Sequence, residues 1–304
     1  MPLGRHGSSL RPARAAGTSE RSIMPVHEPG IDTSKPNIAR VWDYWLGGKD
    51  NFAADRALAQ RVEGLFGPPP PGRLPVPREM AVRNRLFLER AVTWCARQRG
   101  IAQFLDLGSG LPAGGAVPMP DGTVTQVTDT HTAARAVIGD ARVVYADIDP
   151  VAVSHAQALL CRTGVTAVRG DVRDPGAILA DPAVGAVIGL EEPCCVVLGM
   201  VLHFCGASEA RRITGEIARA LAPGSVLVVS VARCDDPQLW TSIEAVYTAG
   251  RVHNHARAEV VSFLAGLDVL KPGVVPARGW RPGWRDSAPS DAPSYALCGV
   301  AVKP

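Results

Sequence analysis

Phe104-Leu105-Asp106-Leu107-Gly108-Ser109-Gly110 is a short apolar run that ends in an acidic residue and a glycine turn. An apolar run bounded by glycine is typical of a strand in a parallel sheet, where both faces are covered. Gly108 and Gly110 lack a Cβ atom, so a ligand can approach the backbone closely there. Asp106 would lie at the carboxyl end of the strand, where open α/β sheets bind their ligands. The stretch therefore predicts a nucleotide-type site at the edge of a parallel sheet.

Two further segments repeat this arrangement of a strand followed by a carboxylate. The apolar run 143–146 leads into Asp147, and the run 165–168 is followed by Asp171. Right-handed crossovers between parallel strands would place these carboxylates and Asp106 along one edge of the sheet. The second carboxylate suits the two hydroxyls of a ribose, and the third suits an exocyclic amine such as that of adenine. A single Asp at a strand end is usually a turn residue, but three in succession predict ligand binding.

Strands and helices are predicted to alternate over the rest of the chain. Strand patterns occur at 194–202, 225–231, 267–275 and 295–302, and helix patterns at 129–137, 150–164, 208–221, 237–249 and 257–264. Ser208 is the expected cap of its helix, and three prolines with an Asp-Gly pair predict a loop at 111–125. This alternation predicts a Rossmann-like, doubly wound α/β fold with a mainly parallel seven-stranded sheet.

The residues before the sheet are predicted to form a helical cap. Apolar side chains recur at helical spacing over 38–46, and Gly47-Gly48 ends that helix. Further helix patterns follow at 51–67 and 79–98. Residues 1–23 carry four arginines against one glutamate and no apolar periodicity, which favours a disordered tail. We therefore expect three parts: the tail at 1–23, the cap at 24–100 and the sheet domain at 101–304.

Composition argues against several classes of function. The chain's net charge of +3 lies in residues 1–23, so the remainder is neutral and lacks the basic surface of a nucleic-acid-binding protein. A run of 18 apolar residues is absent, which argues against a membrane span. The seven cysteines are odd in number and lack a C-x-x-C motif, which favours free thiols in a reducing cytoplasm over disulfides or a metal site. We expect a cytoplasmic protein without a metal, and the sequence leaves its oligomeric state open.

Several motifs together resemble a known family. They are Arg40-Val41-Trp42-Asp43-Tyr44-Trp45-Leu46-Gly47-Gly48-Lys49-Asp50-Asn51-Phe52, the glycine-turn stretch 104–112, the segment 141–150, Val201-Leu202-His203-Phe204 and Gly299-Val300-Ala301. With them the chain resembles the class I S-adenosylmethionine-dependent methyltransferases, and more narrowly the actinobacterial S-adenosyl methyltransferase family long catalogued as a domain of unknown function. The Leu-Gly-Gly-Lys-Asp-Asn-Phe stretch is the distinctive part, because D-x-G-x-G is common to all class I enzymes.

The resemblance implies an enzyme that uses S-adenosyl-L-methionine to methylate a small-molecule acceptor. It implies that Asp106 and the turn Gly108-Ser109-Gly110 line the methionine part of the cofactor. Asp147 would hold the ribose, Ile148 would pack on the adenine, and Asp171 with Val172 would meet the adenine edge. The cap region around Tyr44 and Gly48 would fold over the cofactor. The resemblance also implies that 101–304 is the cofactor-binding domain and that the last strand runs antiparallel.

Two alternative functions remain open at this stage. Residues 108–113 also fit G-x-G-x-x-A, the dinucleotide fingerprint of an NAD-dependent oxidoreductase, although that motif needs a helix to start there and Pro112 disfavours one. Asp147 follows Gly110 by 37 residues, against about 20 in a typical nucleotide-binding unit. The second alternative is a non-catalytic protein that binds S-adenosylmethionine or S-adenosylhomocysteine, since no catalytic residue is obvious.

One side chain is a candidate catalytic group. His203 follows the fourth predicted strand and could act as a general base near neutral pH. A structural histidine packed beside Phe204 is the competing interpretation. Trp280 and Trp284 lie in a segment rich in proline and glycine, which predicts either a lid over the site or a plain surface turn.

Overall fold

The computed structural model describes residues 31–281 and 295–304, and residues 32–304 form one compact unit. The strands of the main sheet are β1 (Gln103–Leu107), β4 (Arg142–Asp147), β5 (Val165–Arg169), β6 (Cys195–Gly199), β7 (Val226–Ala232), β8 (Asp268–Val269), β9 (Val275–Pro276) and β10 (Ala296–Val302). The predicted tail and Trp284 lie outside the described residues, and the division into cap and sheet domain stays a prediction.

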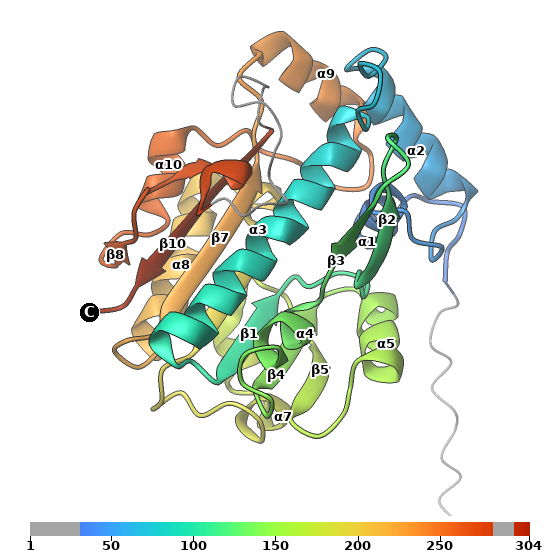
Figure 1. The fold of residues 1–304 in the computed structure, drawn as a ribbon. Coiled ribbons are helices and arrows are strands. Elements are labelled where there is room, and N and C mark those ends of the chain that lie inside the picture. Colours follow the sequence, from blue (N-terminus) through green and yellow to red (C-terminus); the bar gives the residue numbers. More distant parts are fainter. Residues whose placement is uncertain (1–30, 282–294) are drawn as a thin grey trace, which may run out of the picture. The chain divides into compact units, whose positions relative to one another are not determined.

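The sheet confirms the predicted fold class. Its order is β5-β4-β1-β6-β7-β10-β8, with β9 also paired to β10 (Figure 1). β1 pairs in parallel with β4 and β6, whereas β10 runs antiparallel to β7. Among the described residues this sheet has eight strands and not seven, because the single strand predicted at 267–275 is two short strands, β8 and β9. The order reverses at β1, so the carboxyl ends of β1 and its neighbours border a crevice in which this fold class binds ligands.

Helices cover both faces of the sheet (Figure 1). In chain order they are α1 (Ile38–Trp45), α2 (Ala53–Gly64), α3 (Val76–Arg99), α4 (Thr130–Arg135), α5 (Pro150–Leu159), α6 (Pro175–Leu179), α7 (Pro182–Gly185), η1 (Leu202–Phe204), α8 (Ala207–Ala220), α9 (Pro237–Val246), α10 (Arg257–Ser262) and η2 (Ala277–Gly279). None of these helices is both long enough and apolar enough to cross a membrane. The sequence did not predict α6 and α7, and Gly206 rather than Ser208 caps α8.

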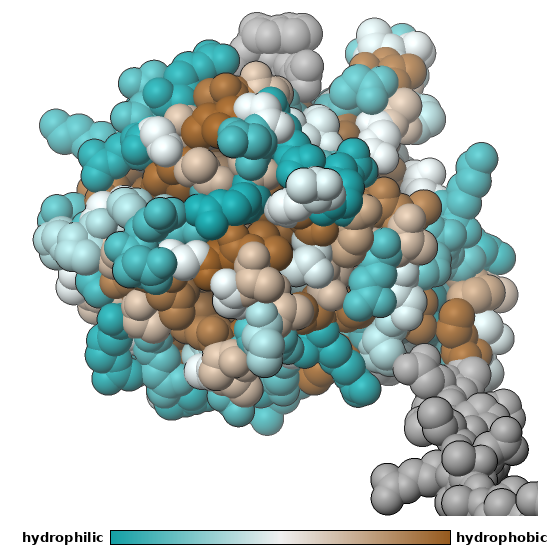
Figure 2. All heavy atoms as spheres, turned by 90° about the horizontal axis from the view of Figure 1, so that it is seen from below, coloured by the Kyte–Doolittle hydropathy of each residue, from teal (hydrophilic) through white to brown (hydrophobic). Residues whose placement is uncertain are grey.

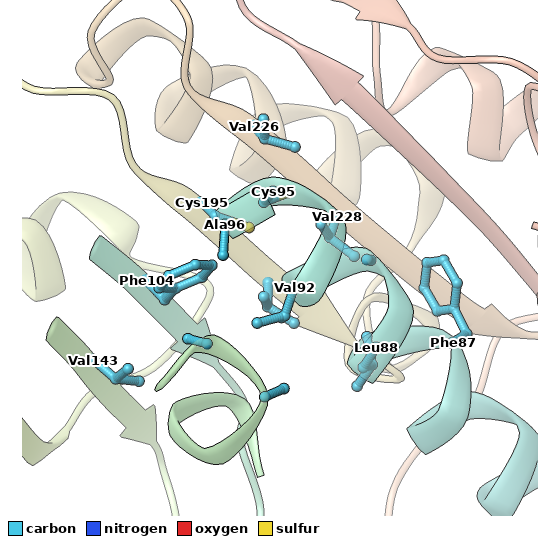
Figure 3. Packing of buried hydrophobic residues seen from close by; sticks show 14 of the residues in the cluster. Phe87, Leu88, Val92, Cys95, Ala96, Phe104, Val143, Cys195, Val226 and Val228 are labelled. Carbon is cyan, nitrogen blue, oxygen red and sulfur yellow. The ribbon is translucent and has the colours of Figure 1, made fainter. Parts of the chain in front are cut away.

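Strand side chains alternate between two cores, as the period of a pleated strand requires. Phe104 of β1 lies on the face that α3 covers, in the cluster shown in Figure 3, to which Phe87 and Leu88 of α3 also belong. Leu105 of the same strand packs on the opposite face with residues of α8, among them Ile213. Because both faces are covered, the strands are mainly apolar between their ends, which explains why they were recognisable in the sequence.

Helix α3 links the cap to the sheet. Its first half, with Ala81, Val82 and Leu86, packs in a third cluster with α1 and α2, and its second half lies on the sheet. Gly100 ends the helix with a φ of 64°. The same element therefore positions the cap over the carboxyl edge of the sheet.

A buried ion pair ties the start of the cap together. Arg40 of α1 and Asp55 of α2 are 4% and 0% exposed, and Arg40 Nε lies 2.8 Å from Asp55 Oδ2. The other oxygen of Asp55 accepts a 2.8 Å hydrogen bond from the backbone nitrogen of Asn37. Asn51, in the glycine-containing turn between the helices, donates to Asp43 and to the carbonyl of Gly48. The polar run after the glycines thus holds the turn in place.

The predicted loop at 111–125 is wrong in part, because it contains a hairpin. β2 (Gly115–Pro118) and β3 (Val124–Val127) pair in an antiparallel arrangement. Val117 and Val127 are buried in the third cluster, together with residues of α1 and α2. The extra residues between Gly110 and Asp147 therefore complete the cap, and the hairpin turn explains the Asp121-Gly122 pair that suggested a loop.

Trp280 is neither part of a lid nor a surface residue. It is fully buried, and its ring packs edge to face against Phe87 and Trp94 of α3. Packing between distant segments hides a side chain that its proline- and glycine-rich surroundings suggested to be exposed.

On the face shown in Figure 2, hydrophobic residues lie interspersed with hydrophilic ones.

Candidate functional site

A cavity of about 200 Å³ lies at the carboxyl ends of β1, β4 and β5. Most of the predicted cofactor-binding residues line it: Asp106, Gly108, Ser109, Gly110, Asp147, Ile148, Asp171 and Val172. Residues of α1 and of the turn after β6 complete the wall. The parallel pairing of the three strands therefore brings together side chains that are up to 66 residues apart in the sequence.

The two glycines of the turn after β1 have different surroundings. Gly108 has a φ of 68°, and a Cβ atom there would lie 2.5 Å from Cγ2 of Val201. Gly110 has a φ of 67°, but a Cβ atom there would meet no atom within 4 Å. Gly108 is thus required for packing of the turn against the segment after β6, whereas Gly110 borders open space in the cavity.

Asp147 at the end of β4 holds the glycine turn across the gap of 37 residues. Its Oδ2 atom accepts a 2.8 Å hydrogen bond from the Gly110 nitrogen, and Oδ1 accepts one from the Asp149 nitrogen at 2.9 Å. Burial raises the pKa of this carboxyl, although these two hydrogen bonds oppose the shift. Each carboxylate oxygen can accept more than one hydrogen bond, so both remain able to bind vicinal hydroxyls.

Asp106 at the end of β1 is 4% exposed. Its Oδ2 atom accepts a 2.6 Å hydrogen bond from Thr130 Oγ1, at the start of α4. Burial raises the pKa of Asp106 to about 6, and Thr130 and the positive charge of Arg85 limit the rise. A cation bound in the cavity would stabilise the charged form of this carboxyl further.

The cavity as a whole carries more acidic than basic side chains. Its lining includes the carboxyls of Asp43, Asp106, Asp147, Asp149 and Asp171 and the guanidinium groups of Arg85 and Arg173. Arg173 is already paired, with its NH1 atom 3.4 Å from Asp171 and its Nε atom 3.7 Å from Glu209. This excess of carboxylates favours a ligand with positive charge.

An apolar surface accompanies the carboxylates. Ile148 is 52% exposed at the cavity, an unusual position for a large aliphatic side chain, while Val172 beside it is buried. A flat ring such as adenine could cover Ile148 and remove its side chain from water. The two side chains therefore provide an apolar platform between the carboxylates of β4 and β5.

The sequence predicted that the cap around Tyr44 and Gly48 folds over the cofactor, but it did not indicate which side chains of the cap line the cavity. Trp42 and Asp43 of α1 and Leu46, the residue that follows α1, line it. Asn37, which caps α1, donates a 2.8 Å hydrogen bond from Nδ2 to Asp149 Oδ2 at the start of α5. This contact spans 112 residues.

Three predicted site residues do not line this cavity. The Tyr44 hydroxyl accepts a hydrogen bond from Gln60, and the Arg78 guanidinium lies over the ring. A Cβ atom at Gly48 would lie 1.9 Å from Asp43 Oδ1, so this glycine is required for packing within the cap turn. Contact of Tyr44 and Gly48 with the cofactor stays a prediction.

His203 in η1 is 3% exposed and packs on Phe204, with the ring centroids 4.2 Å apart. Its Nδ1 atom lies 3.5 Å from the backbone nitrogen of Ala232, which donates to it. Burial lowers the pKa of His203 to about 3. A catalytic role for His203 stays a prediction, but the low pKa makes the ring a weak base.

An NAD-binding fingerprint needs a helix that starts at the glycine turn, and the structure does not have one there. Residues 111–113 are not helical, and the next helix starts only at Thr130. Asp129, just before that helix, instead accepts hydrogen bonds from the nitrogens of Ala113 and Gly114 at 3.0 and 3.1 Å. A helix N-terminus that could bind a pyrophosphate is therefore missing at this turn.

The donor set fits S-adenosylmethionine. Paired acceptors at Asp147 suit a ribose, the platform at Ile148 suits a purine, and the excess of carboxylates suits the positive charges of the ammonium and sulfonium groups. The open space at Gly110 leaves room for the ligand beside the backbone.

Comparison with known proteins supports the same conclusion. The model of a family described as S-adenosyl methyltransferase matches residues 25–304. A crystal structure from Thermobifida fusca YX, described as that of a candidate methyltransferase, is 35% identical, with 93% of this chain and 99% of that chain covered and a TM-score of 0.76. A DUF574 family protein from Streptomyces avermitilis MA-4680 is 28% identical, with 90% and 99% covered and a TM-score of 0.77. A search of curated proteins found no match. The chain therefore belongs to the S-adenosyl methyltransferase family.

Proposed function

We propose that this S-adenosylmethionine-dependent methyltransferase methylates a small-molecule acceptor, and that the carboxylates of Asp106, Asp147 and Asp171 hold its cofactor. The observation that supports the site is the cavity in which these three strand-end residues meet the glycine turn under α1. The cap supports a small acceptor, because side chains of α1 form part of the wall of the cavity.

The residues of the chain would act mainly by binding and positioning. When bound, the cofactor supplies a methyl group on a positively charged sulfur, which is electrophilic without further activation. Asp147 would fix the ribose, and Asp106 would bind the cationic methionine end. Trp42 and Leu46, which line the cavity, would shield the bound cofactor from solvent, and alignment of an acceptor with the methyl group would then provide most of the rate.

We also propose that the protein acts in the cytoplasm. All seven cysteines are free thiols, and six of them are buried. Burial raises the pKa of Cys194 to about 12 and that of Cys205 to about 11, so both thiols stay protonated and unreactive at neutral pH. A chain with this many unpaired thiols is typical of a reducing compartment.

Calorimetry tests the cofactor site. We expect S-adenosylmethionine and S-adenosylhomocysteine to bind, and NAD⁺ to bind at least 100-fold more weakly. Tight binding of NAD⁺ without binding of either sulfur nucleoside would overturn the proposal. Formation of S-adenosylhomocysteine in the presence of acceptors then separates an enzyme from a protein that only binds the cofactor.

A further inference from the structure

A second cavity, of about 60 Å³, lies beside the cofactor cavity and has a different chemistry. Its wall is built from α1, α2, the start of α3, the end of β7, α9 and the residue before β10. The side chains that carry the argument are Trp42, Trp45, Trp240, Tyr247 and His203. Nearly all of its surface is apolar and much of it is aromatic.

Three polar atoms of this wall have no hydrogen-bond partner. They are Nε1 of Trp45, Nε1 of Trp240 and Oη of Tyr247. Their residues are 4%, 7% and 7% exposed, so these atoms are shielded from bulk solvent. The Trp42 indole is near enough to Tyr247 to oppose the rise of its pKa, but it does not form a hydrogen bond with suitable geometry. An unpaired buried polar group costs about 1–3 kcal/mol, so three around one cavity indicate a missing ligand with oxygen or nitrogen acceptors.

The rings of the wall form a continuous series. Trp42 packs edge to face on Trp45 at 5.5 Å, and Trp45 stacks on Tyr247 at 6.5 Å between ring centroids. Tyr247 in turn stacks on Phe204 at 6.3 Å. An aromatic ligand beside these rings could pack on them edge to face or in an offset stack.

The cavity disfavours charged ligands. Its one ionised side chain among the described residues is Arg233, whose Nε and NH2 atoms lie 3.0 and 2.7 Å from Asp235 Oδ1. His203, the other titratable basic group of the wall, has its pKa lowered by burial and is neutral at pH 7. A carboxylate would lack a free cationic partner here, and an ammonium group would lack an anionic one.

The two cavities share a wall. Trp42 lines both of them, while Phe204 lines the cofactor cavity and its neighbour His203 lines the second one. A ligand of the second cavity would therefore lie against the same Trp42 side chain and the same turn, 203–204, that border the cofactor cavity.

We propose that the second cavity binds the methyl acceptor, and that the acceptor is a neutral aromatic compound with at least two oxygens, one of them a phenolic hydroxyl. This inference rests on the proposed function. One oxygen accepts hydrogen bonds from the indole N–H groups of Trp45 and Trp240. The phenolic oxygen, on the side of Trp42, bonds to the methyl carbon as the carbon–sulfur bond breaks with its electron pair left on sulfur, and the phenolic proton passes to water.

The size of the cavity requires that its mouth opens. A cavity of about 150 Å³ accommodates benzene, which exceeds the 60 Å³ present here. Phe66 and Tyr295 both line the cavity, are partly exposed and pack edge to face with their ring centroids 5.0 Å apart. Rotation of these two rings admits the acceptor.

Saturation-transfer NMR with the full chain and S-adenosylhomocysteine tests this assignment. The probe is 4-hydroxyacetophenone, which is neutral and has a phenolic and a carbonyl oxygen. The matched ligands are 4-hydroxybenzoate, an anion, and tyramine, a cation. We expect the neutral probe to bind at least tenfold more tightly than either charged one. When S-adenosylmethionine is supplied in place of S-adenosylhomocysteine, the protein should convert the neutral probe to its methyl ether and release S-adenosylhomocysteine.

Conservative variants separate the cavity from general stability. Trp45→Phe, Trp240→Phe and Tyr247→Phe keep the rings and remove the unpartnered polar atoms, and each indole variant should weaken binding of the neutral probe about fivefold to tenfold. Trp94→Phe, on the far side of α3 beside Trp280, is the matched control and should have no effect. All four should keep the wild-type affinity for S-adenosylhomocysteine by calorimetry.

Each outcome either supports or overturns the inference. Equal binding of the neutral and charged probes, absence of binding of 4-hydroxyacetophenone, or unchanged affinity in both indole variants overturns it. If S-adenosylhomocysteine binds in those cases, the proposed function survives and only the acceptor class is wrong. If S-adenosylhomocysteine fails to bind, the proposed function is wrong and the acceptor assignment falls with it.

Discussion

The two cavities on either side of Trp42 differ in how the chain builds them. The cofactor cavity is acidic, and its main residues directly follow strands of one parallel sheet. The second cavity is apolar, and its residues come from helices and turns spread from Trp42 to Tyr295. Sheet pairing defines the first cavity, whereas packing of the cap on α9 defines the second. Loss of a contact that anchors α1 should therefore disturb both cavities, and a change at a strand end should disturb only the first.

The largest effect is expected from the buried ion pair of the cap. Asp55→Asn leaves the Arg40 guanidinium buried without a charged partner, and breaking such a pair costs about 3–5 kcal/mol of stability. Because this pair anchors α1, which walls both cavities, ligand binding at both should decline. Chemical denaturation gives the free energy of unfolding. Asp32→Asn, which removes an exposed pair with Lys35, is the control and should leave stability nearly unchanged. Similar losses for the two variants would mean that the buried pair does not anchor the cap.

Two alanine substitutions in the glycine turn should differ from each other. Gly108→Ala forces an L residue to a φ of 68° and brings its Cβ atom to 2.5 Å from Val201. Conformational strain of about 1–2 kcal/mol and overpacking of about 1–3 kcal/mol should add. Gly110→Ala, with a φ of 67° and no neighbour within 4 Å, should show only the first cost. Thermal unfolding measures both. Each variant should still bind the neutral probe at the second cavity. If either variant fails to bind the probe, the two cavities are coupled through the glycine turn.

Asp147→Ala should weaken cofactor binding by about 1.5–3 kcal/mol, because a charged acceptor of ribose hydroxyls is removed. Asp149→Ala should affect affinity less and stability more. Asp149 Oδ1 caps α5 through the Val151 nitrogen and Oδ2 accepts from Asn37, and loss of a cap costs about 1 kcal/mol. Calorimetry and denaturation together distinguish the two residues. An equal or larger loss of affinity at Asp149 would place the ribose there instead.

The smallest effect concerns pH. The pKa of Asp106 is raised to about 6 without ligand, so this residue holds a proton below pH 6 that an unfolded chain would release near pH 4. Its contribution to the stability of the free protein therefore falls as the pH rises from about 4 to 6. A cationic cofactor binds the ionised form, so affinity should rise roughly tenfold between pH 5 and pH 7. Calorimetry across this range should show a much flatter profile for Asp106→Asn. A wild-type affinity independent of pH would remove Asp106 from the contact with the cation.

The strand ends were predictable from the sequence because their causes are local. A strand buried on both faces must be apolar over its whole length, as 143–146 is, and a carboxylate that ends such a strand is conspicuous. Because crossovers between parallel strands are right-handed, Asp106, Asp147 and Asp171 could be placed on one edge of the sheet without any knowledge of side-chain packing. The family, the enzyme class and the cofactor came instead from the resemblance of the glycine turn and the cap motif to a known family.

The hairpin and the buried Trp280 were predicted incorrectly because their determinants are not local. Proline, glycine and Asp-Gly mark the ends of segments, but they do not show whether two short segments pair with each other, as β2 and β3 do. Whether a tryptophan is buried depends on what packs over it, and the cover of Trp280 comes from α3, almost 200 residues earlier.

The sequence by itself determined the alternation of strands and helices, the acidic edge of the sheet and the glycine turn. These features arise from hydrophobic periodicity and backbone conformation, which act between neighbouring residues. Only the tertiary structure decided that Asn37 meets Asp149, that Gly48 packs on Asp43, and that three tryptophans and a tyrosine enclose a second cavity. Those contacts depend on the shapes of distant side chains and on the angle at which the cap meets the sheet, and no spacing along the chain encodes that angle.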